Sequence, residues 1–228
     1  MAPLRNYVAC AEPRATYAAM VTRMDQHVGR ILEQLAKLGL EQNTMVMFAS
    51  DNGPAAPDVG ADAEFFGSAV GARGLKGDVY EGGIRIPLVV RWPGHVKAGA
   101  TSDWVTALWD FLPTAAEVAG VGRGVEKVMT DGVSIVPTLT GSGRQQEREF
   151  LYWEIPMKGQ QRAIRKGSWK AVQIGIKGNA SAPVELYDLA SDPGENKNVA
   201  ADHPEMVEQL RGLMDHARTP CQKAEWNW

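Results

Sequence analysis

Residues 44–54 read TMVMFASDNGP, and this stretch decides the fold class. Its near-continuous apolar run over 44–50 predicts a strand of a parallel sheet that is covered on both faces. The run leads directly into Asp51 and Asn52, and the Gly-Pro pair that follows favours a tight turn. Ligands in open α/β sheets bind outside the carboxyl ends of the strands, so this strand tip is a candidate binding site.

The segments on either side complete an α/β pattern. Apolar residues recur at steps of three and four over 16–38, which predicts an amphipathic helix before the strand. Residues 53–83 are rich in glycine and lack periodicity, and a loop of that length is typical of a functional segment. A second apolar run over 84–92 predicts another strand, and Pro87 within it indicates that part of this strand lies at a sheet edge or forms a bulge. Residues 104–119 predict a helix that Pro113 kinks or breaks.

The sequence pattern changes after residue 142. Short strand-like runs at 150–153, 161–165, 168–174 and 184–187 are separated by turn residues, which predicts an antiparallel meander. An amphipathic helix is predicted over 205–216. We therefore predict two domains, 1–142 and 143–228.

Composition excludes some classes of protein. The chain has 228 residues, 44% of them hydrophobic, and a net charge of −3. A packed core is expected, whereas nucleic-acid binding would need a basic face. No apolar run is long enough to predict a membrane span. The two cysteines, Cys10 and Cys221, allow one disulfide or two separate thiols, and they do not indicate a compartment.

Two features carry candidate chemistry. Asp51 and Asn52 offer a carboxylate and an amide oxygen, which are hard ligands suited to Ca²⁺ or Mg²⁺; the alternative is that an Asp-Asn-Gly sequence only forms a turn. Lys76 stands between Gly74 and Gly77, where glycine lets the backbone approach a ligand, and its ammonium suits a tetrahedral oxyanion. The alternative is a surface lysine in a flexible loop.

Several segments, in this order and at this spacing, resemble the sulfatase family. They cover nearly the whole chain, and the most specific of them contains Lys76. The segments are YAAMVTRMDQHVGRIL (17–32), TMVMFASDNGP (44–54), GLKGDVYEGGIRIPLVVRWPG (74–94), DFLPTAAEVAG (110–120) and ELYDLASDPGENKNVA (185–200).

The resemblance implies an α/β fold: part of an alkaline-phosphatase-like sheet flanked by helices, plus a small C-terminal antiparallel sheet with a helix. It implies hydrolysis of sulfate esters by a formylglycine nucleophile with a divalent cation, usually Ca²⁺. By motif, Asp51 and Asn52 correspond to two metal ligands. Lys76 corresponds to the lysine that binds sulfate and acts in catalysis. Arg73, Tyr80, Glu81 and Arg85 are expected to shape the loop without a catalytic role.

The sequence also departs from the family. The family's Cys/Ser-x-Pro-x-Arg motif, its early aspartates and its active-site histidines precede the matched segments, and the chain is expected to be the C-terminal part of a sulfatase. Cys10-Ala11-Glu12-Pro13-Arg14 has proline one position too late and lies too close to Asp51, so we interpret it as coincidence. The four histidines, at 27, 95, 203 and 216, do not occupy the missing motif.

Three expectations and one alternative follow. The chain alone should lack turnover because its nucleophile is missing, so whether it is itself an enzyme is left open. It should self-associate through exposed sheet edges and apolar faces. Many relatives are exported, which implies a periplasmic or secreted parent protein but does not set the compartment of this chain. A phosphatase or phosphodiesterase of the same superfold, or a non-catalytic folded or sugar-binding module, is the alternative.

Overall fold

The computed structural model describes residues 13–56, 61–121, 130–179 and 181–223. These form two compact units, one made of Met1–Asp51 with Pro87–Arg148 and the other of Asn52–Ile86 with Glu149–Trp228. Within the second unit, the predicted functional loop groups with the C-terminal segments. The predicted boundary near residue 142 does not reflect this grouping, and the domain division stays a prediction.

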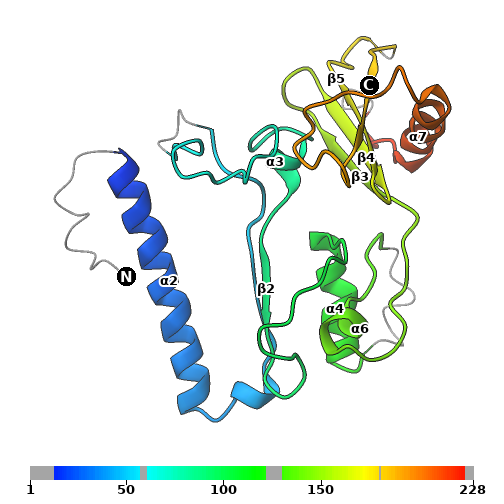
Figure 1. Cartoon of the computed structure of the whole chain (residues 1–228). Helices are drawn as coiled ribbons and strands as arrows, with labels where there is room; N and C mark the ends of the chain where they lie inside the picture. Colours follow the sequence, from blue (N-terminus) through cyan, green and yellow to red (C-terminus); the bar gives the residue numbers. More distant parts are fainter. Residues whose placement is uncertain (1–12, 57–60, 122–129, 180, 224–228) are drawn as a thin grey trace. The chain divides into compact units, whose positions relative to one another are not determined.

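The helices and strands are as follows in chain order (Figure 1): α2 Pro13–Lys37, η1 Glu41–Asn43, β1 Val46–Ala49, α3 Glu81–Ile84, β2 Leu88–Arg91, η3 Leu108–Asp110, α4 Phe111–Val118, α6 Val136–Thr140, β3 Leu151–Ile155, β4 Gln161–Lys166, β5 Trp169–Ile174, β6 Val184–Asp188 and α7 Pro204–Ala217.

Helix α2 confirms the amphipathic helix predicted over 16–38, and Gly39 ends it in a left-handed conformation. None of its residues is buried. The apolar positions that the periodicity placed on one face are open, with Met20 65% and Ile31 59% exposed. The apolar face of α2 therefore has no cover among the described residues.

Strand β1 forms at the predicted position, but its predicted environment is wrong. Within the described part of the chain it pairs only with β2, antiparallel, with Val46 opposite Arg91 and Ala49 opposite Leu88. Neither strand is buried on both faces. An apolar run indicates which side chains are expected to be buried, but it does not specify whether the neighbouring strand runs parallel or antiparallel.

The helix predicted over 104–119 begins later than expected. A 3-10 turn precedes α4, which starts at Phe111, and Pro113 falls in the first helical turn. Amide groups in that turn have no carbonyl partner within the helix, so proline is tolerated there without a kink. The prediction of a break at Pro113 is therefore wrong, and the short helix α6 had not been predicted.

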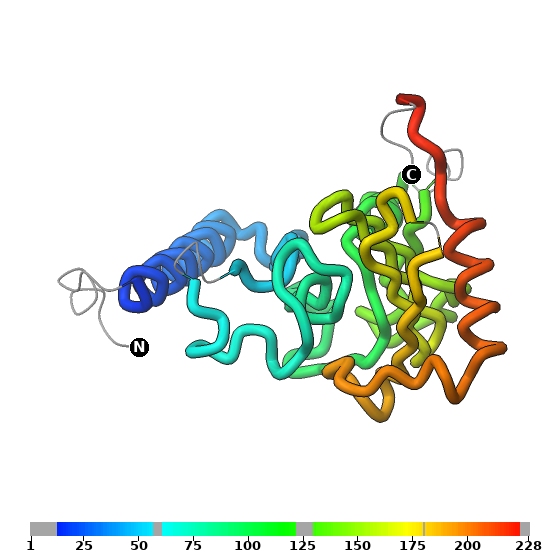
Figure 2. Tube along the Cα trace, turned by 90° about the horizontal axis from the view of Figure 1, so that it is seen from above, coloured from blue at the N-terminus to red at the C-terminus, as the bar shows by residue number. Residues whose placement is uncertain are grey.

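The C-terminal meander confirms the prediction. Strands β3, β4, β5 and β6 form a four-stranded antiparallel sheet in sequence order. Helix α7, predicted over 205–216, lies along this sheet, and both views show it beside the strands (Figures 1 and 2). Turn residues between apolar runs determine this local topology, which explains why it could be predicted.

Both faces of the four-stranded sheet are covered. Ile164, Ala171 and Leu186 pack against Leu210 and Met214 of α7 on one face. The alternate residues of the same strands pack on the other face against Val79 and Tyr80; they are Ala163, Val172 and Tyr187. The predicted functional loop is therefore one of the two layers that bury this sheet.

Candidate functional site

The strand tip carries the two predicted metal ligands. β1 ends at Ala49, and Asp51 follows with an exposed side chain. Asn52 is half-buried, and its side-chain nitrogen donates a hydrogen bond to the carbonyl of Gly53 at 2.9 Å. This bond turns the amide of Asn52 back onto the chain, so the side chain is held at the tip.

Gly53 and Pro54 join this tip to the loop that carries Lys76. The Gly53 N–H donates to the Gly83 carbonyl at 2.8 Å, and the Lys76 N–H donates to the Pro54 carbonyl at 2.9 Å. A β-carbon on Gly53 would lie 1.9 Å from the Gly82 carbonyl oxygen. Glycine is therefore required, and the two backbone bonds bring the Asn52 turn beside the Lys76 turn.

The turn around Lys76 depends on its glycines. Gly74 has φ +85° and Gly77 has φ +90°, both in the region that favours glycine. The Leu75 N–H donates to the Asp78 carboxylate at 3.0 Å and closes the turn. Lys76 itself is exposed, and its ammonium has no ion pair with a described residue of its unit.

The glycines at 82 and 83 serve backbone packing. A β-carbon on Gly82 would lie 2.1 Å from the Gly74 carbonyl oxygen, and one on Gly83 would lie 2.1 Å from that of Asp78. The sequence suggested that glycines near Lys76 allow a ligand to approach. In the structure, those at 82 and 83 allow one segment of backbone to approach another, which makes the loop compact.

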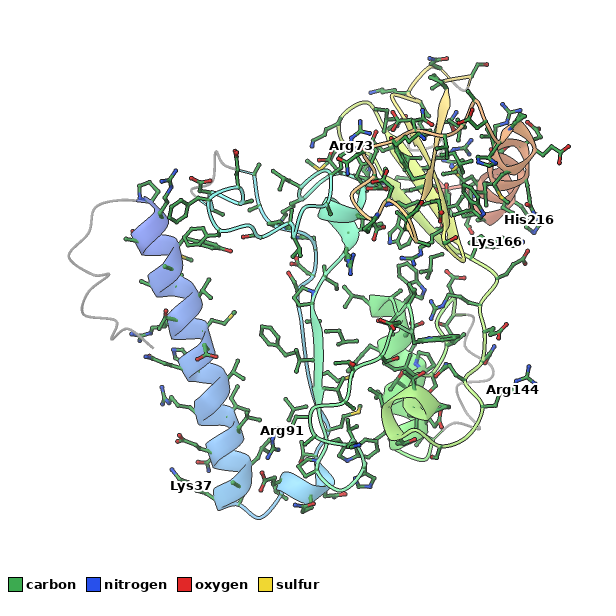
Figure 3. All side chains as sticks on the ribbon, in the orientation of Figure 1. Lys37, Arg73, Arg91, Arg144, Lys166 and His216 are labelled. Carbon is green, nitrogen blue, oxygen red and sulfur yellow. The ribbon has the colours of Figure 1, made fainter. Side chains whose placement is uncertain are left out.

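The loop residues expected to play a shaping role contact the C-terminal sheet. Arg73 donates to the Tyr187 hydroxyl at 2.7 Å, and its guanidinium lies 4.0 Å from the centre of the Tyr80 ring. Tyr80 and Tyr187 both donate to Glu185, at 2.7 and 2.5 Å. Figure 3 shows Arg73 where the loop reaches the sheet. Arg85 contributes a backbone bond to Glu81.

Burial raises the pKa of Tyr80, and the hydrogen bond to Glu185 raises it further. The pKa of Tyr187 is raised by the same two causes in the same order. Both hydroxyls therefore keep their protons and act as hydrogen-bond donors. This supports a shaping role for Tyr80.

Two polar residues of the C-terminal sheet were missed. Gln161 donates to the Gly77 carbonyl at 2.9 Å, next to Lys76. Lys170 is fully buried and forms ion pairs with Glu81 and Glu195. The sequence does carry a signal for Lys170, because in WKAVQI (169–174) a lysine interrupts an apolar run within the predicted meander.

As a metal site, the described residues are incomplete. Among them, no group of three or more His, Cys, Asp or Glu side chains could hold a metal ion. Asp51 and Asn52 are both hard oxygen donors and fit Ca²⁺ or Mg²⁺ chemically, yet Ca²⁺ takes ~6–8 oxygens. These residues could supply only part of a coordination sphere.

Two protein-family models match this chain. The "Sulfatase" model matches residues 5–121, which is half of the chain, and the model "N-sulphoglucosamine sulphohydrolase, C-terminal" matches residues 76–219. The chain belongs to the sulfatase family. The family has the alkaline-phosphatase-like fold, and its members typically use Ca²⁺ and formylglycine.

The individual relatives are longer than this chain. The chain is 34% identical to steryl-sulfatase of Mus musculus over 87% of its own length and 35% of that protein. It is 33% identical to human arylsulfatase A over 88% of its length and 43% of that protein. This sulfatase chain therefore spans less than half the length of these relatives.

Solved structures support the fold. The structure of Ps i-CgsB in complex with k-i-k-neocarrahexaose superposes with a TM-score of 0.78 at 28% identity, covering 95% of this chain and 46% of that one. The phosphonate monoester hydrolase of Agrobacterium radiobacter has a TM-score of 0.63 at 28% identity, over 90% and 42%. The mixed α/β fold with antiparallel sheets is thus that of part of a sulfatase.

Two further sequence features are a possible membrane span and the two cysteines. Among the described residues, no helix is both long and apolar enough to cross a membrane. The pairing of Cys10 and Cys221 stays a prediction, because Cys10 lies outside the described residues, and so do Ala11 and Glu12 of the Cys10–Arg14 stretch.

Proposed function

We propose that this chain supplies the sulfate-binding lysine and two metal ligands for the hydrolysis of sulfate esters by a sulfatase. Lys76 is the residue that binds sulfate and acts in catalysis, and Asp51 and Asn52 hold the divalent cation. The match of the C-terminal sulphohydrolase model from residue 76 onward supports the assignment to the C-terminal part.

The observation that carries this proposal is the pair of backbone bonds between the two turns. Gly53 donates to Gly83, and Lys76 donates to Pro54, so the turn of Asn52, a proposed cation ligand, adjoins the turn of Lys76 within one unit. Gly53 lies so close to Gly82 that a β-carbon on Gly53 would be 1.9 Å from the Gly82 carbonyl oxygen. Such fixed placement is what electrostatic catalysis requires, since groups already in position need no reorganisation.

Each residue has a defined task. The Lys76 ammonium attracts a sulfate oxygen and stabilises the negative charge that develops on it. The Asp51 carboxylate and the Asn52 side-chain oxygen are cation ligands, and a bound Ca²⁺ or Mg²⁺ would neutralise charge on the sulfate. Arg73 and Tyr80 hold the loop from the side of the C-terminal sheet.

We infer that the 228-residue chain has no turnover by itself. A Cys/Ser-x-Pro-x-Arg motif, the source of formylglycine in this family, does not occur in its sequence. Without a nucleophile the covalent route loses its central step. The chain is expected to bind sulfate and a divalent cation but not to hydrolyse sulfate esters.

Calcium titration by calorimetry tests the metal part of the proposal. The unsubstituted chain should bind with a Kd no tighter than roughly 10⁻³ M, the weak end for protein Ca²⁺ sites. Asp51→Ala should abolish that binding, whereas the exposed control Asp103→Ala should retain it. Equal binding by the two variants would contradict the role of Asp51.

A chromogenic aryl sulfate assay on the same samples tests the absence of turnover. The pure chain should give no product above the rate without protein. Turnover that persists in the unsubstituted chain and disappears in Lys76→Ala would show that another residue acts as nucleophile, and the inference of inactivity would be wrong.

A phosphoester or phosphonate substrate is the second candidate, since the phosphonate monoester hydrolase of Agrobacterium radiobacter shares the fold. Inorganic sulfate and inorganic phosphate can be titrated in parallel. The proposed function expects a lower Kd for sulfate at Lys76, and a clear preference for phosphate would favour the alternative.

A further inference from the structure

A cluster of buried charges lies beneath the loop that carries Lys76. The Lys170 ammonium, on β5, donates to Glu81 at 2.9 Å and lies 2.8 Å from Oε1 of Glu195. The second oxygen of Glu195 accepts the backbone N–H of Glu81 at 2.6 Å. The Lys170 and Glu195 side chains are 0% exposed, and that of Glu81 is 6% exposed. The cluster is therefore removed from water.

A fourth group balances the charge. Arg165 on β4 has its guanidinium 4.0 Å from the other oxygen of Glu81. Two cations and two carboxylates thus meet where α3 lies against the sheet. They join α3, the strands β4 and β5, and the segment after β6.

Stability alone is a poor reason for this cluster. Replacing a buried ion pair with apolar side chains of similar volume is often neutral or stabilising, because removing charges from water is costly. Glu195 also has φ +56°, a conformation that residues other than glycine rarely adopt. Unfavourable backbone geometry and buried charge at one residue indicate that its exact placement matters.

The backbone transmits this placement to Lys76. Glu81 is the first residue of α3, and the next residue, Gly82, donates to the Arg73 carbonyl at 2.7 Å, before the Lys76 turn. Gly83 accepts from Gly53 at the strand tip. Fixing α3 therefore fixes the base of the Lys76 turn and its contact with the tip.

We propose that Lys170 and Glu195 are positioning residues for Lys76, acting through Glu81 and α3. The C-terminal sheet, through this cluster, sets the place at which the exposed ammonium meets an oxyanion. This role rests on the proposed function of Lys76 as the sulfate-binding residue.

The test uses the full 228-residue chain at pH 8 and inorganic sulfate as the probe. Sulfate binding is followed by the amide NMR signal of Gly77, and Lys76→Ala should remove the sulfate-dependent shift. Glu195→Gln keeps the size of the side chain but removes its charge. Glu208→Gln, the same substitution at an exposed glutamate on α7, is the matched control.

Glu195→Gln should raise the Kd for sulfate at least fivefold. It should also speed hydrogen exchange of the amides in residues 74–83 by about tenfold, the effect of losing one charge-assisted hydrogen bond. Exchange in α7 should stay unchanged. Glu208→Gln should match the unsubstituted chain in all three measurements.

The outcomes separate the two proposals. Faster exchange with an unchanged Kd would show a structural role only, and an unchanged exchange rate would show that the cluster does not hold the loop; either result overturns the positioning role. If Lys76-dependent sulfate binding is absent in the unsubstituted chain, the proposed function falls, and the positioning role with it.

A second variant covers the case in which Glu195→Gln does not fold. Lys170→Met combined with Glu195→Gln removes one charge of each sign and leaves Glu81 with Arg165, so the buried region stays neutral. The folded double variant should show the same higher Kd and faster exchange. A double variant that folds and binds sulfate like the unsubstituted chain overturns the role.

Discussion

Gly53→Ala is the sharpest test of the contact between the strand tip and the lysine loop. The added methyl would lie 1.9 Å from the Gly82 carbonyl oxygen and 2.9 Å from both the Gly82 carbonyl carbon and the Gly83 α-carbon. All three atoms belong to the backbone, so no side chain can rotate away. The two segments must separate, and the bond from Gly53 to Gly83 must lengthen or break.

The expected cost follows from two effects. Overpacking a close contact costs ~1–3 kcal/mol, and the loss of a backbone hydrogen bond adds ~1 kcal/mol. We therefore expect Gly53→Ala to lower the free energy of unfolding by about 2–4 kcal/mol. Part of this loss can appear as local detachment of the turn, which would also move Asn52 away from Lys76.

Urea unfolding followed by circular dichroism measures the loss, with the midpoint compared at constant slope. Gly212→Ala is the matched control, because it adds the same methyl in α7 of the same unit, where no atom lies within 4 Å. Alanine there should stabilise the chain by roughly 0.5–1 kcal/mol. If Gly53→Ala unfolds within 0.5 kcal/mol of the unsubstituted chain, the tip and the loop are not packed as described.

Two further predictions concern other parts of the chain. The buried carboxylate of Asp110 accepts the N–H groups of Ala107 and Val133 at 2.8 and 3.0 Å and forms an ion pair with Arg148. Asp110→Ala should therefore lower the free energy of unfolding, measured in urea, by about 3–5 kcal/mol. An alanine at an exposed acidic site should lower it by less than about 0.5 kcal/mol. The open apolar face of α2 should drive self-association, so Ile31→Asp should reduce it in sedimentation velocity; an unsubstituted chain that is monomeric at high concentration would contradict this.

Local patterns were enough to predict several elements. The three- and four-residue spacing of apolar side chains predicted α2 and α7, and runs of strand residues between turns predicted β3 to β6. These features depend on residues close together in the chain. The direction of pairing of β1 could not be predicted, because an apolar run is equally compatible with either kind of neighbour.

The sequence by itself determined the family, the order of the longer elements and the candidate residues Asp51, Asn52 and Lys76, because short motifs and periodicity carry that information. Only the tertiary structure decided what the glycine-rich loop packs against. Lys170 and Glu81 are 89 residues apart, and Glu81 and Glu195 are 114 apart. No local pattern links such residues; they meet because the loop buries one face of the C-terminal sheet, and a charge placed there must find its partner within the fold.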